Sequence, residues 1–218
     1  MSRKIRQTQK IFKVFCEGGT EHHYIDELRR QKKLSITLKL VNMEGGGYRN
    51  FLEQVKTDGT TNCLAKFIII DGDRAVSEEG EKKNLGELLK YCILQNKTGR
   101  IPHFLIVNDP DFEYIACLHT PKYSGQNTAQ YLLRELGYKS VDAFKADKKI
   151  YHVLNTNGNS YAQMLSLLRS ENCFIRNKYA INKKQYEMKV SSTYDWEKLG
   201  RKASNINEFF EVINDFST

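Results

Sequence analysis

The chain has 218 residues, which is enough for one large domain or for one domain with an addition. Hydrophobic residues make up 40% of it and charged residues 28%, and no apolar run approaches the roughly 18–20 residues of a membrane span. The N-terminus shows no apolar signal-peptide stretch, so we expect a cytoplasmic protein without a membrane segment. The five cysteines are scattered without zinc spacing, which argues against a disulfide framework or a structural zinc site.

Basic residues exceed acidic ones, 34 Lys and Arg against 26 Asp and Glu, and the formal net charge is +8. They gather in two segments, 1–10 and 176–189, the first without an acid and the second with one. Such segments suit a polyanionic partner such as nucleic acid, although a solvated surface explains them equally well. The candidate nucleic-acid-binding residues are Arg3, Lys4, Arg6, Lys10, Arg74, Arg176, Lys178, Lys183 and Lys184.

The first half of the chain alternates between strand-like and helix-like segments. Apolar or strictly alternating runs predict strands at 11–16, 35–41, 65–71 and 103–107. Apolar residues at helical spacing predict helices at 20–32, 48–56 and 80–96, with a glycine turn at 45–47. This alternation is typical of an α/β fold in which a mostly parallel sheet is flanked by helices.

The second half follows a different pattern. Helices are predicted at 112–118, 127–136, 160–170 and 203–215, with Asn205 or Asn207 as the cap of the last one. The polar stretch 176–199 has no clear period and stays unassigned. We therefore expect a core over 1–120 and a helical C-terminal elaboration over 121–218 that packs on the same core.

Carboxylates follow three of the predicted strands. They are Glu17 and Glu21, Asp71 and Asp73, and Glu113. Because open α/β sheets place their chemistry beyond the carboxyl ends of parallel strands, we expect these acids to share one crevice. Simpler explanations exist for two of them, since an acid such as Glu21 is favoured in a first helical turn, and Asp71–Gly72 is common turn chemistry.

A metal site is the economical explanation for the whole set, because carboxylates that converge on one edge would repel each other without cations among them. Asp71 and Asp73, as alternate residues of an extended segment, would face the same side. Hard oxygen ligands suit Mg²⁺ or Mn²⁺. Asp109 and Asp111 are more simply a turn residue and a helix cap, and His119 is as readily a buried histidine as a functional one.

The segment VFCEGGTEHHY, followed by IIIDGDR, resembles the Toprim arrangement of a glutamate after the first strand and a DxD motif after a later one. The segment FLIVNDPDFEYIACLH is similar to the asparagine–proline–x–phenylalanine–glutamate signature, ending in histidine, of the RloB family of prokaryotic Toprim proteins. The match covers about residues 12–119, just over half of the chain. The sequence departs from the family pattern at Asn108, Asp109, Asp111 and Ile115, whereas all five acids are retained.

The resemblance implies a Mg²⁺-dependent nuclease of the Toprim type, associated with antiphage defence or restriction loci, for which Mn²⁺ would be an alternative cofactor. It implies metal ligation by Glu17, Glu21, Asp71 and Asp73, and a catalytic set that adds Glu113 and His119. A partner or activating protein of the defence locus is a further expectation, and self-association stays open.

A second class of function also stays open, namely a non-catalytic nucleic-acid-binding or sensor subunit, which the basic segments alone would serve. A Toprim topoisomerase or primase is disfavoured, because the chain has no room for gate domains and lacks the zinc and helicase-binding parts. The sequence has no P-loop motif for an ATPase. DNA and RNA, including tRNA, offer the same phosphodiester chemistry, and the sequence does not distinguish between them.

Overall fold

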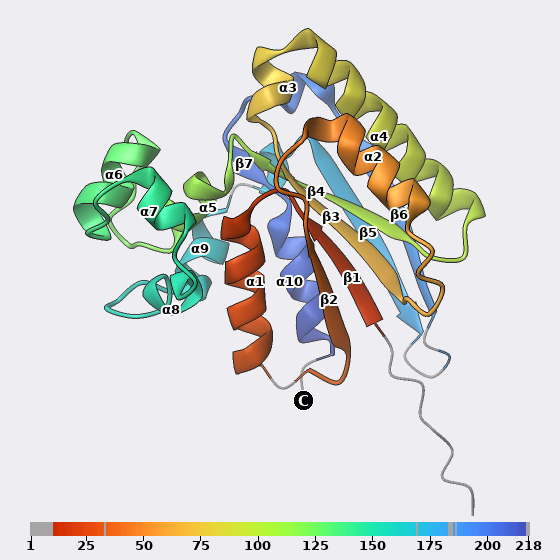
Figure 1. Cartoon of the computed structure of the whole chain (residues 1–218), viewed down its shortest axis with the longest axis horizontal. Helices are drawn as coiled ribbons and strands as arrows, with labels where there is room; N and C mark the ends of the chain where they lie inside the picture. The colour runs from red at the N-terminus through yellow and green to blue at the C-terminus, as the bar shows by residue number, and fades with distance from the viewer. Residues whose placement is uncertain (1–10, 33, 169, 183–184, 186, 217–218) are drawn as a thin grey trace, which may run out of the picture.

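A five-stranded sheet forms the centre of the computed structural model, which describes residues 11–216 apart from 33, 169, 183–184 and 186 (Figure 1). Its strands are β1 Ile11–Cys16, β2 Thr37–Asn42, β3 Ala65–Asp71, β4 His103–Asp109 and β7 Ala203–Ser204. They lie in the order β2–β1–β3–β4–β7, in which β7 alone is antiparallel to its neighbour. The predicted α/β class with a mostly parallel sheet is confirmed, and the arrangement is consistent with a Toprim-like core.

The predicted helices are present with bounds close to those expected. They are α1 Gly19–Gln31, α2 Gly47–Thr57, α4 Glu79–Thr98, α5 Phe112–Leu118, α6 Thr128–Glu135, α9 Tyr161–Leu167 and α10 Ile206–Asn214. Three short helices were not predicted: α3 Asp73–Ser77, α7 Val141–Lys145 and α8 Ile150–Val153. None of the helices in the described part of the chain has the length and apolarity needed to cross a membrane.

The two faces of the sheet are buried by different helices. Alternate side chains such as Phe67 and Ile69 join the apolar cluster that includes α1 and α10. Their neighbours, such as Ile68 and Ile70, join the cluster that includes α2 and α4 on the other face (Figure 1). Because both faces are covered, β3 and β4 are almost continuous apolar runs, which made them easy to predict.

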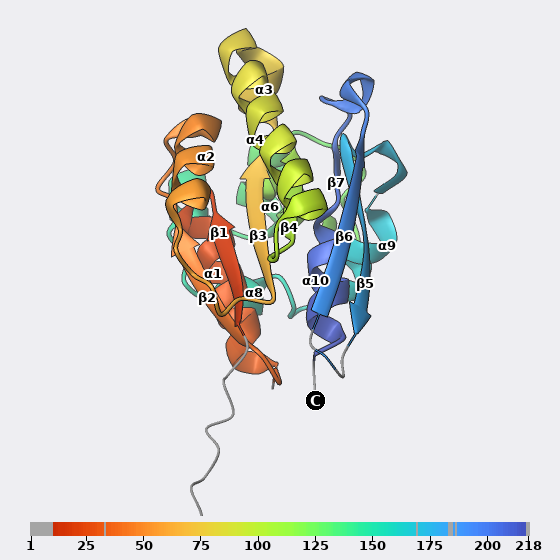
Figure 2. The same ribbon diagram turned by 90° about the vertical axis from the view of Figure 1, so that its right-hand side faces the viewer.

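The stretch that the sequence left unassigned contains a β-hairpin. Strand β5 Ile175–Asn182 pairs with the antiparallel strand β6 Glu187–Tyr194, and Figure 2 shows the hairpin beside α10 at the β4 edge of the sheet. Its burial alternates, with Ile175 and Asn177 buried and Arg176 and Lys178 exposed. The C-terminal elaboration contains the predicted helices, but it also adds this hairpin and the strand β7 of the central sheet, so it is not helical throughout.

Polar side chains cover the free edge of β4 below its short pairing with β7. The side-chain amides of Asn177 and Asn205 both donate to the Leu105 carbonyl oxygen at 3.0 Å, and Asn205 Oδ1 accepts the Val107 N–H at 2.9 Å. The buried carboxylate of Glu208 accepts hydrogen bonds from both asparagine side chains. Asn205 thus occupies the predicted N-cap position of α10 but uses its side chain to satisfy the edge of the sheet.

Candidate acidic pocket at the carboxyl edge of the sheet

All five predicted acids line one cavity of about 250 Å³ at the carboxyl ends of β1, β3 and β4. We call it the acidic pocket, because the carboxylates outnumber the cations among its lining residues. Its charged residues are Glu17, Glu21, Asp71, Asp73 and Glu113, with Arg74 and Lys145. The parallel register brings these segments together, since β1 pairs with β3 and β3 pairs with β4 up to Asp71 and Asn108.

Glu17 connects the ends of two strands. Its backbone N–H donates to the Ile69 carbonyl oxygen at 3.1 Å, and its Oε2 accepts the Asp71 N–H at 2.8 Å. Burial raises the pKa of Glu17, and the charges of Asp73 and Glu81 act in the same direction. The side chain is therefore held at the strand ends while its carboxyl group is shifted towards the protonated form.

Glu21 lies in the first turn of α1 and is only 2% exposed. Burial raises its pKa to about 7, and the charges of Glu113 and Glu17 add to the effect, although hydrogen bonds from the backbone at Glu21 and Gly18 oppose it. A Cβ at Gly18 would lie 3.3 Å from Glu21 Oε2, so the glycine leaves room for this carboxylate. Both sequence interpretations of Glu21 apply, since a first-turn acid also faces the pocket.

Asp71 carries the least satisfied carboxylate of the pocket. Its Oδ1 is buried and receives no hydrogen bond from the residues that the structure describes. Burial raises the pKa of Asp71 well above its ordinary value, and the charges of Glu21, Glu17 and Glu113 raise it further. A buried carboxylate oxygen without a donor is costly, so this atom requires a proton or a cation.

Asp73 reaches the pocket by a different route from the one predicted. It does not continue an extended strand but begins α3, and its Oδ1 accepts the N–H of Arg74 at 2.6 Å. The chain turns at Gly72, whose N–H donates to the carbonyl oxygens of Asn108 and Pro110. The argument from alternate residues of a strand was therefore wrong, although Asp71 and Asp73 line the same cavity.

Two cations face the carboxylates. Lys145, at the end of α7, places Nζ 3.1 Å from Glu113 Oε1. Burial would lower the pKa of Lys145, but Glu113, Asp71 and Asp111 outweigh it and raise the pKa. Sequence reasoning missed Lys145, because no local motif marks it. Arg74 was named for nucleic-acid binding and lies on the pocket wall, within 3.8 Å of Glu81.

His119 lies outside the acidic pocket. It is completely buried, its Nδ1 donates to the Ile115 carbonyl oxygen at 3.0 Å, and its Nε2 accepts the Tyr24 hydroxyl at 2.9 Å. Burial lowers the pKa of His119 to about 4. The position of His119 therefore does not support the catalytic role that the resemblance implies. The ring is a neutral core histidine with both nitrogens hydrogen-bonded, and it links the end of α5 to α1.

The structure describes some of the remaining candidate residues and not others. Arg176 and Lys178 are exposed on β5 and do not line the acidic pocket. Asp111 caps α5 by accepting the Tyr114 N–H at 2.8 Å, which is the simpler role expected for it. The expectation that Asp109 is a turn residue was wrong, because Asp109 ends β4 and its side chain accepts the N–H of Gly200, 91 residues further along the chain. Six candidates lie outside the described residues, namely Arg3, Lys4, Arg6, Lys10, Lys183 and Lys184.

The side chains of the pocket have the oxygen atoms that a hard divalent cation prefers, but their present spacing does not form a binding cage. The donors are carboxylate oxygens, the ligands that Mg²⁺ and Mn²⁺ prefer, and the buried Asp71 Oδ1 has no protein donor in the described chain. Among the described residues, however, no three His, Cys, Asp or Glu side chains are placed close enough to form a ready metal cage. Side-chain rotation would be needed to bring the oxygens together around a cation.

Comparison with protein-family models gives no match, and comparisons with curated proteins and with solved structures also find no similar protein. The class of this protein is therefore described by its fold and its pocket alone. The chain is an α/β protein with a mostly parallel sheet and a carboxylate-lined cavity at the carboxyl ends of its strands.

Proposed function

We propose that the protein is a Mg²⁺- or Mn²⁺-dependent nuclease that hydrolyses phosphodiester bonds of DNA or RNA at the acidic pocket. The observation that carries the proposal is the buried Asp71 Oδ1, which lacks a hydrogen-bond donor in the described chain and lies among other carboxylates. Such a group is costly as a bare anion, and a divalent cation would remove that cost. The same acids are the ones that the Toprim resemblance singles out.

The residues of the pocket divide into groups with different tasks. Glu17, Glu21, Asp71 and Asp73 would hold the cation, which when bound would polarise a phosphoryl oxygen and lower the pKa of a water molecule. If a single cation is bound and Glu21, Asp71 and Asp73 hold it, Glu17 is free to be the base that accepts the proton of the attacking water, and burial raises its pKa in the direction that suits this role. Its hydrogen bond to the Asp71 N–H keeps the carboxyl group in a fixed position.

Lys145 and Arg74 provide the positive charge that a phosphate requires. Lys145 lies against Glu113 with its side chain 53% exposed, so its ammonium group is accessible from the cavity. Arg74 lines the wall on the α3 side. We propose that these two groups contact the non-bridging oxygens of the scissile phosphate and stabilise the charge that develops on it.

The RloB resemblance supports a role as the toxic effector of an antiphage defence system, and tRNA is one of the RNA substrates that the proposal includes. The excess of 34 basic over 26 acidic residues supports a nucleic-acid partner of either kind. The pocket chemistry acts on the phosphodiester and does not distinguish DNA from RNA.

A non-catalytic nucleic-acid-binding subunit is the second candidate, and one specific observation favours it. The carboxylates of the described chain do not form a ready three-ligand metal cage. A binding module would still require an explanation for the clustered carboxylates, because negative charge beside a phosphate backbone weakens binding.

A cleavage panel tests the proposal. Purified protein is incubated with duplex DNA, single-stranded DNA, structured RNA and tRNA, with Mg²⁺, with Mn²⁺ and with EDTA, and Mn²⁺ affinity is measured by calorimetry. The variants are Asp71→Asn and, as a matched control, Asp142→Asn, which changes an exposed acid outside the pocket. We expect cation-dependent cleavage in the wild type and the control, and a loss of about 10³-fold or more in Asp71→Asn.

The two candidates give different results. Substrate binding without cleavage under every condition, together with Mn²⁺ affinity that Asp71→Asn leaves unchanged, would establish the binding module and reject the nuclease. Cleavage that survives Asp71→Asn at the wild-type rate, in protein free of contaminating nuclease, would reject the acidic pocket as the site.

A further inference from the structure

A second cavity, of about 370 Å³, lies at the opposite edge of the sheet. It opens beside the amino ends of β3 and β4, where Lys66 is the register partner of His103. Its lining shares no residue with the acidic pocket. The charged lining residues in the described chain are Lys56, Lys66 and Arg100, with Asp58 as the one acid, so we call this cavity the basic pocket.

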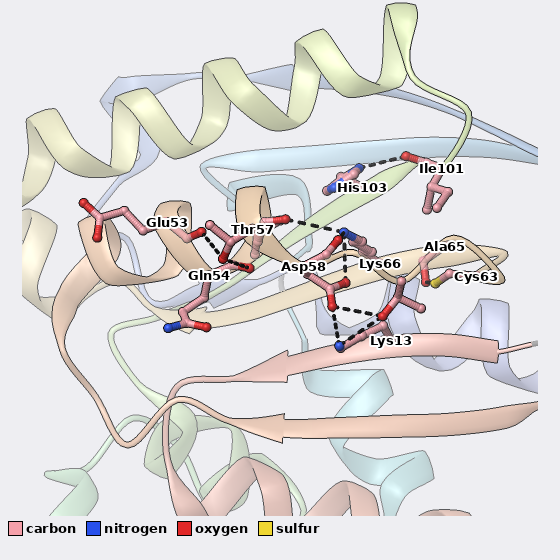
Figure 3. Close-up of polar contacts among 12 residues, drawn as sticks. Lys13, Glu53, Gln54, Thr57, Asp58, Cys63, Ala65, Lys66, Ile101 and His103 are labelled. Atoms are coloured by element: carbon pink, nitrogen blue, oxygen red, sulfur yellow. Dashed lines mark hydrogen bonds and ion pairs between the residues drawn. The ribbon is translucent and has the colours of Figure 1, made fainter.

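Two lysines converge on the single carboxylate. Figure 3 shows Lys13 from β1 and Lys66 from β3 approaching Asp58 from neighbouring strands. Lys66 Nζ lies 3.0 Å from Asp58 Oδ2, and the side chains of Lys66 and Asp58 are only 6% and 10% exposed. One carboxylate cannot neutralise two ammonium groups, so this end of the sheet retains a positive charge at low exposure.

His103 also lines this cavity, and its buried Nε2 is an unused hydrogen-bond acceptor in the described chain. The residue is 2% exposed, and its Nδ1 lies 2.8 Å from the Ile101 carbonyl oxygen, which can only accept, so Nδ1 must carry the proton. In the neutral ring Nε2 then has a lone pair, and no described residue gives it a hydrogen bond. Burial and then the charge of Lys66 lower the pKa of His103 to about 4, which keeps the ring neutral at physiological pH.

The mouth of the basic pocket combines an aromatic ring with exposed cations. Lys56 Nζ lies 5.6 Å from the centroid of the Tyr91 ring, and both residues line the cavity. Arg100 is exposed at the end of the loop that leads into β4. The ring of Tyr91 also contacts His103, with centroids 5.6 Å apart, so the ring connects the charged mouth with the buried imidazole.

We propose that the basic pocket binds a nucleoside monophosphate group, either as a free nucleotide or as the phosphorylated 5′ end of a strand. The phosphate would face Lys56 and Arg100, and the base would pack against Tyr91 with an N–H directed at His103 Nε2. This ligand has the three properties that the cavity requires, which are negative charge, a flat apolar face and a hydrogen-bond donor. The inference concerns a separate cavity and does not rest on the proposed nuclease function.

Calorimetry with EDTA present, so that no cation-dependent cleavage occurs, tests the inference. The probes are adenosine monophosphate, adenosine, inorganic phosphate and a 5′-phosphorylated dinucleotide. The test variant is Lys56→Gln/Arg100→Gln, and the matched control is Lys83→Gln/Lys90→Gln, which removes two exposed cations from α4 outside the cavity. We expect saturable binding of adenosine monophosphate that weakens about tenfold or more in the test variant and is unchanged in the control.

NMR of the His103 ring gives an independent readout. The His103 ring signals should shift on titration with adenosine monophosphate, because a base N–H donated to Nε2 changes the environment of that nitrogen and keeps the ring neutral. Tighter binding of the dinucleotide than of the mononucleotide would assign the site to strand ends, and the reverse would assign it to free nucleotides. Equal weakening in both double variants, adenosine that binds as well as its monophosphate, or His103 signals that do not move would each overturn the inference.

Discussion

Replacement of Glu21 by glutamine should make the cation-free protein more stable at neutral pH. Glu21 is 2% exposed, and burial is the largest cause of its raised pKa, followed among the raising effects by the charges of Glu113 and Glu17. Glutamine has nearly the shape of a protonated glutamic acid but never carries the charge. The substitution therefore removes the unfavourable ionised state and keeps most of the packing.

The magnitude follows from the difference in pKa between the two states of the chain. The ordinary pKa of glutamate is about 4.3, whereas the folded protein holds the pKa of Glu21 at about 7. Because the folded pKa is raised, the folded state binds more protons than the unfolded state between these values, and stability falls as pH rises through the window. The full loss, reached above pH 7, is on the order of 3 kcal/mol.

Urea unfolding with EDTA measures this effect at about pH 4, 6 and 8. The wild type should lose stability across the series, and Glu21→Gln should lose much less, so that the variant is more stable by about 3 kcal/mol at pH 8. The control Glu79→Gln changes an exposed glutamate in the first turn of α4 and should follow the wild type. In a second series with Mg²⁺ in place of EDTA, the wild type should gain most stability at pH 8, where the carboxylates are ionised and bind the cation best. Identical pH slopes for wild type and Glu21→Gln would refute the reasoning.

Three further substitutions test separate features. Lys145→Gln should lower single-turnover cleavage by about 10²-fold and change stability by less than about 1 kcal/mol, since the partly exposed pair with Glu113 contributes little to folding; a wild-type rate would contradict its role. Glu208→Gln should lower the free energy of unfolding in urea by about 2–3 kcal/mol, because an amide donor would then face the buried amides of Asn177 and Asn205. An unchanged free energy of unfolding would contradict the hydrogen-bond network at the β4 edge. Phe209→Ala removes a buried ring from the cluster between the sheet and α10 and should lower the free energy of unfolding by about 3–5 kcal/mol. A loss under about 1 kcal/mol would show that this core is loosely packed.

The sequence determined the features that depend on local patterns. The apolar runs of β1, β3 and β4 and the helical spacing of α1, α2 and α4 were enough to predict the α/β class, because both faces of the sheet are buried. The same runs predicted the crevice, since acids placed after parallel strands meet at one edge. Glu17 and Asp71 are the clearest cases, each at the end of a buried strand.

Only the tertiary structure decided the features that join distant segments. Lys145 enters the acidic pocket from α7, and Lys66 meets Asp58 and Lys13 across neighbouring strands, without any local motif. The β5–β6 hairpin was missed for a related reason. Asn177 is polar but buried, and its hydrogen bonds to Leu105 and to Glu208, 31 residues away along the chain, satisfy it there.

His119 is a residue for which the local sequence suggested a function that its folded environment does not support. Its sequence neighbourhood resembles a family signature, yet burial and the hydroxyl of Tyr24, 95 residues away along the chain, determine that the ring is neutral and part of the core. Local sequence reports the period of burial and the residues at strand ends. The partners and the solvation of each polar group depend on segments that only the folded chain brings together, and these determine its charge and its chemistry.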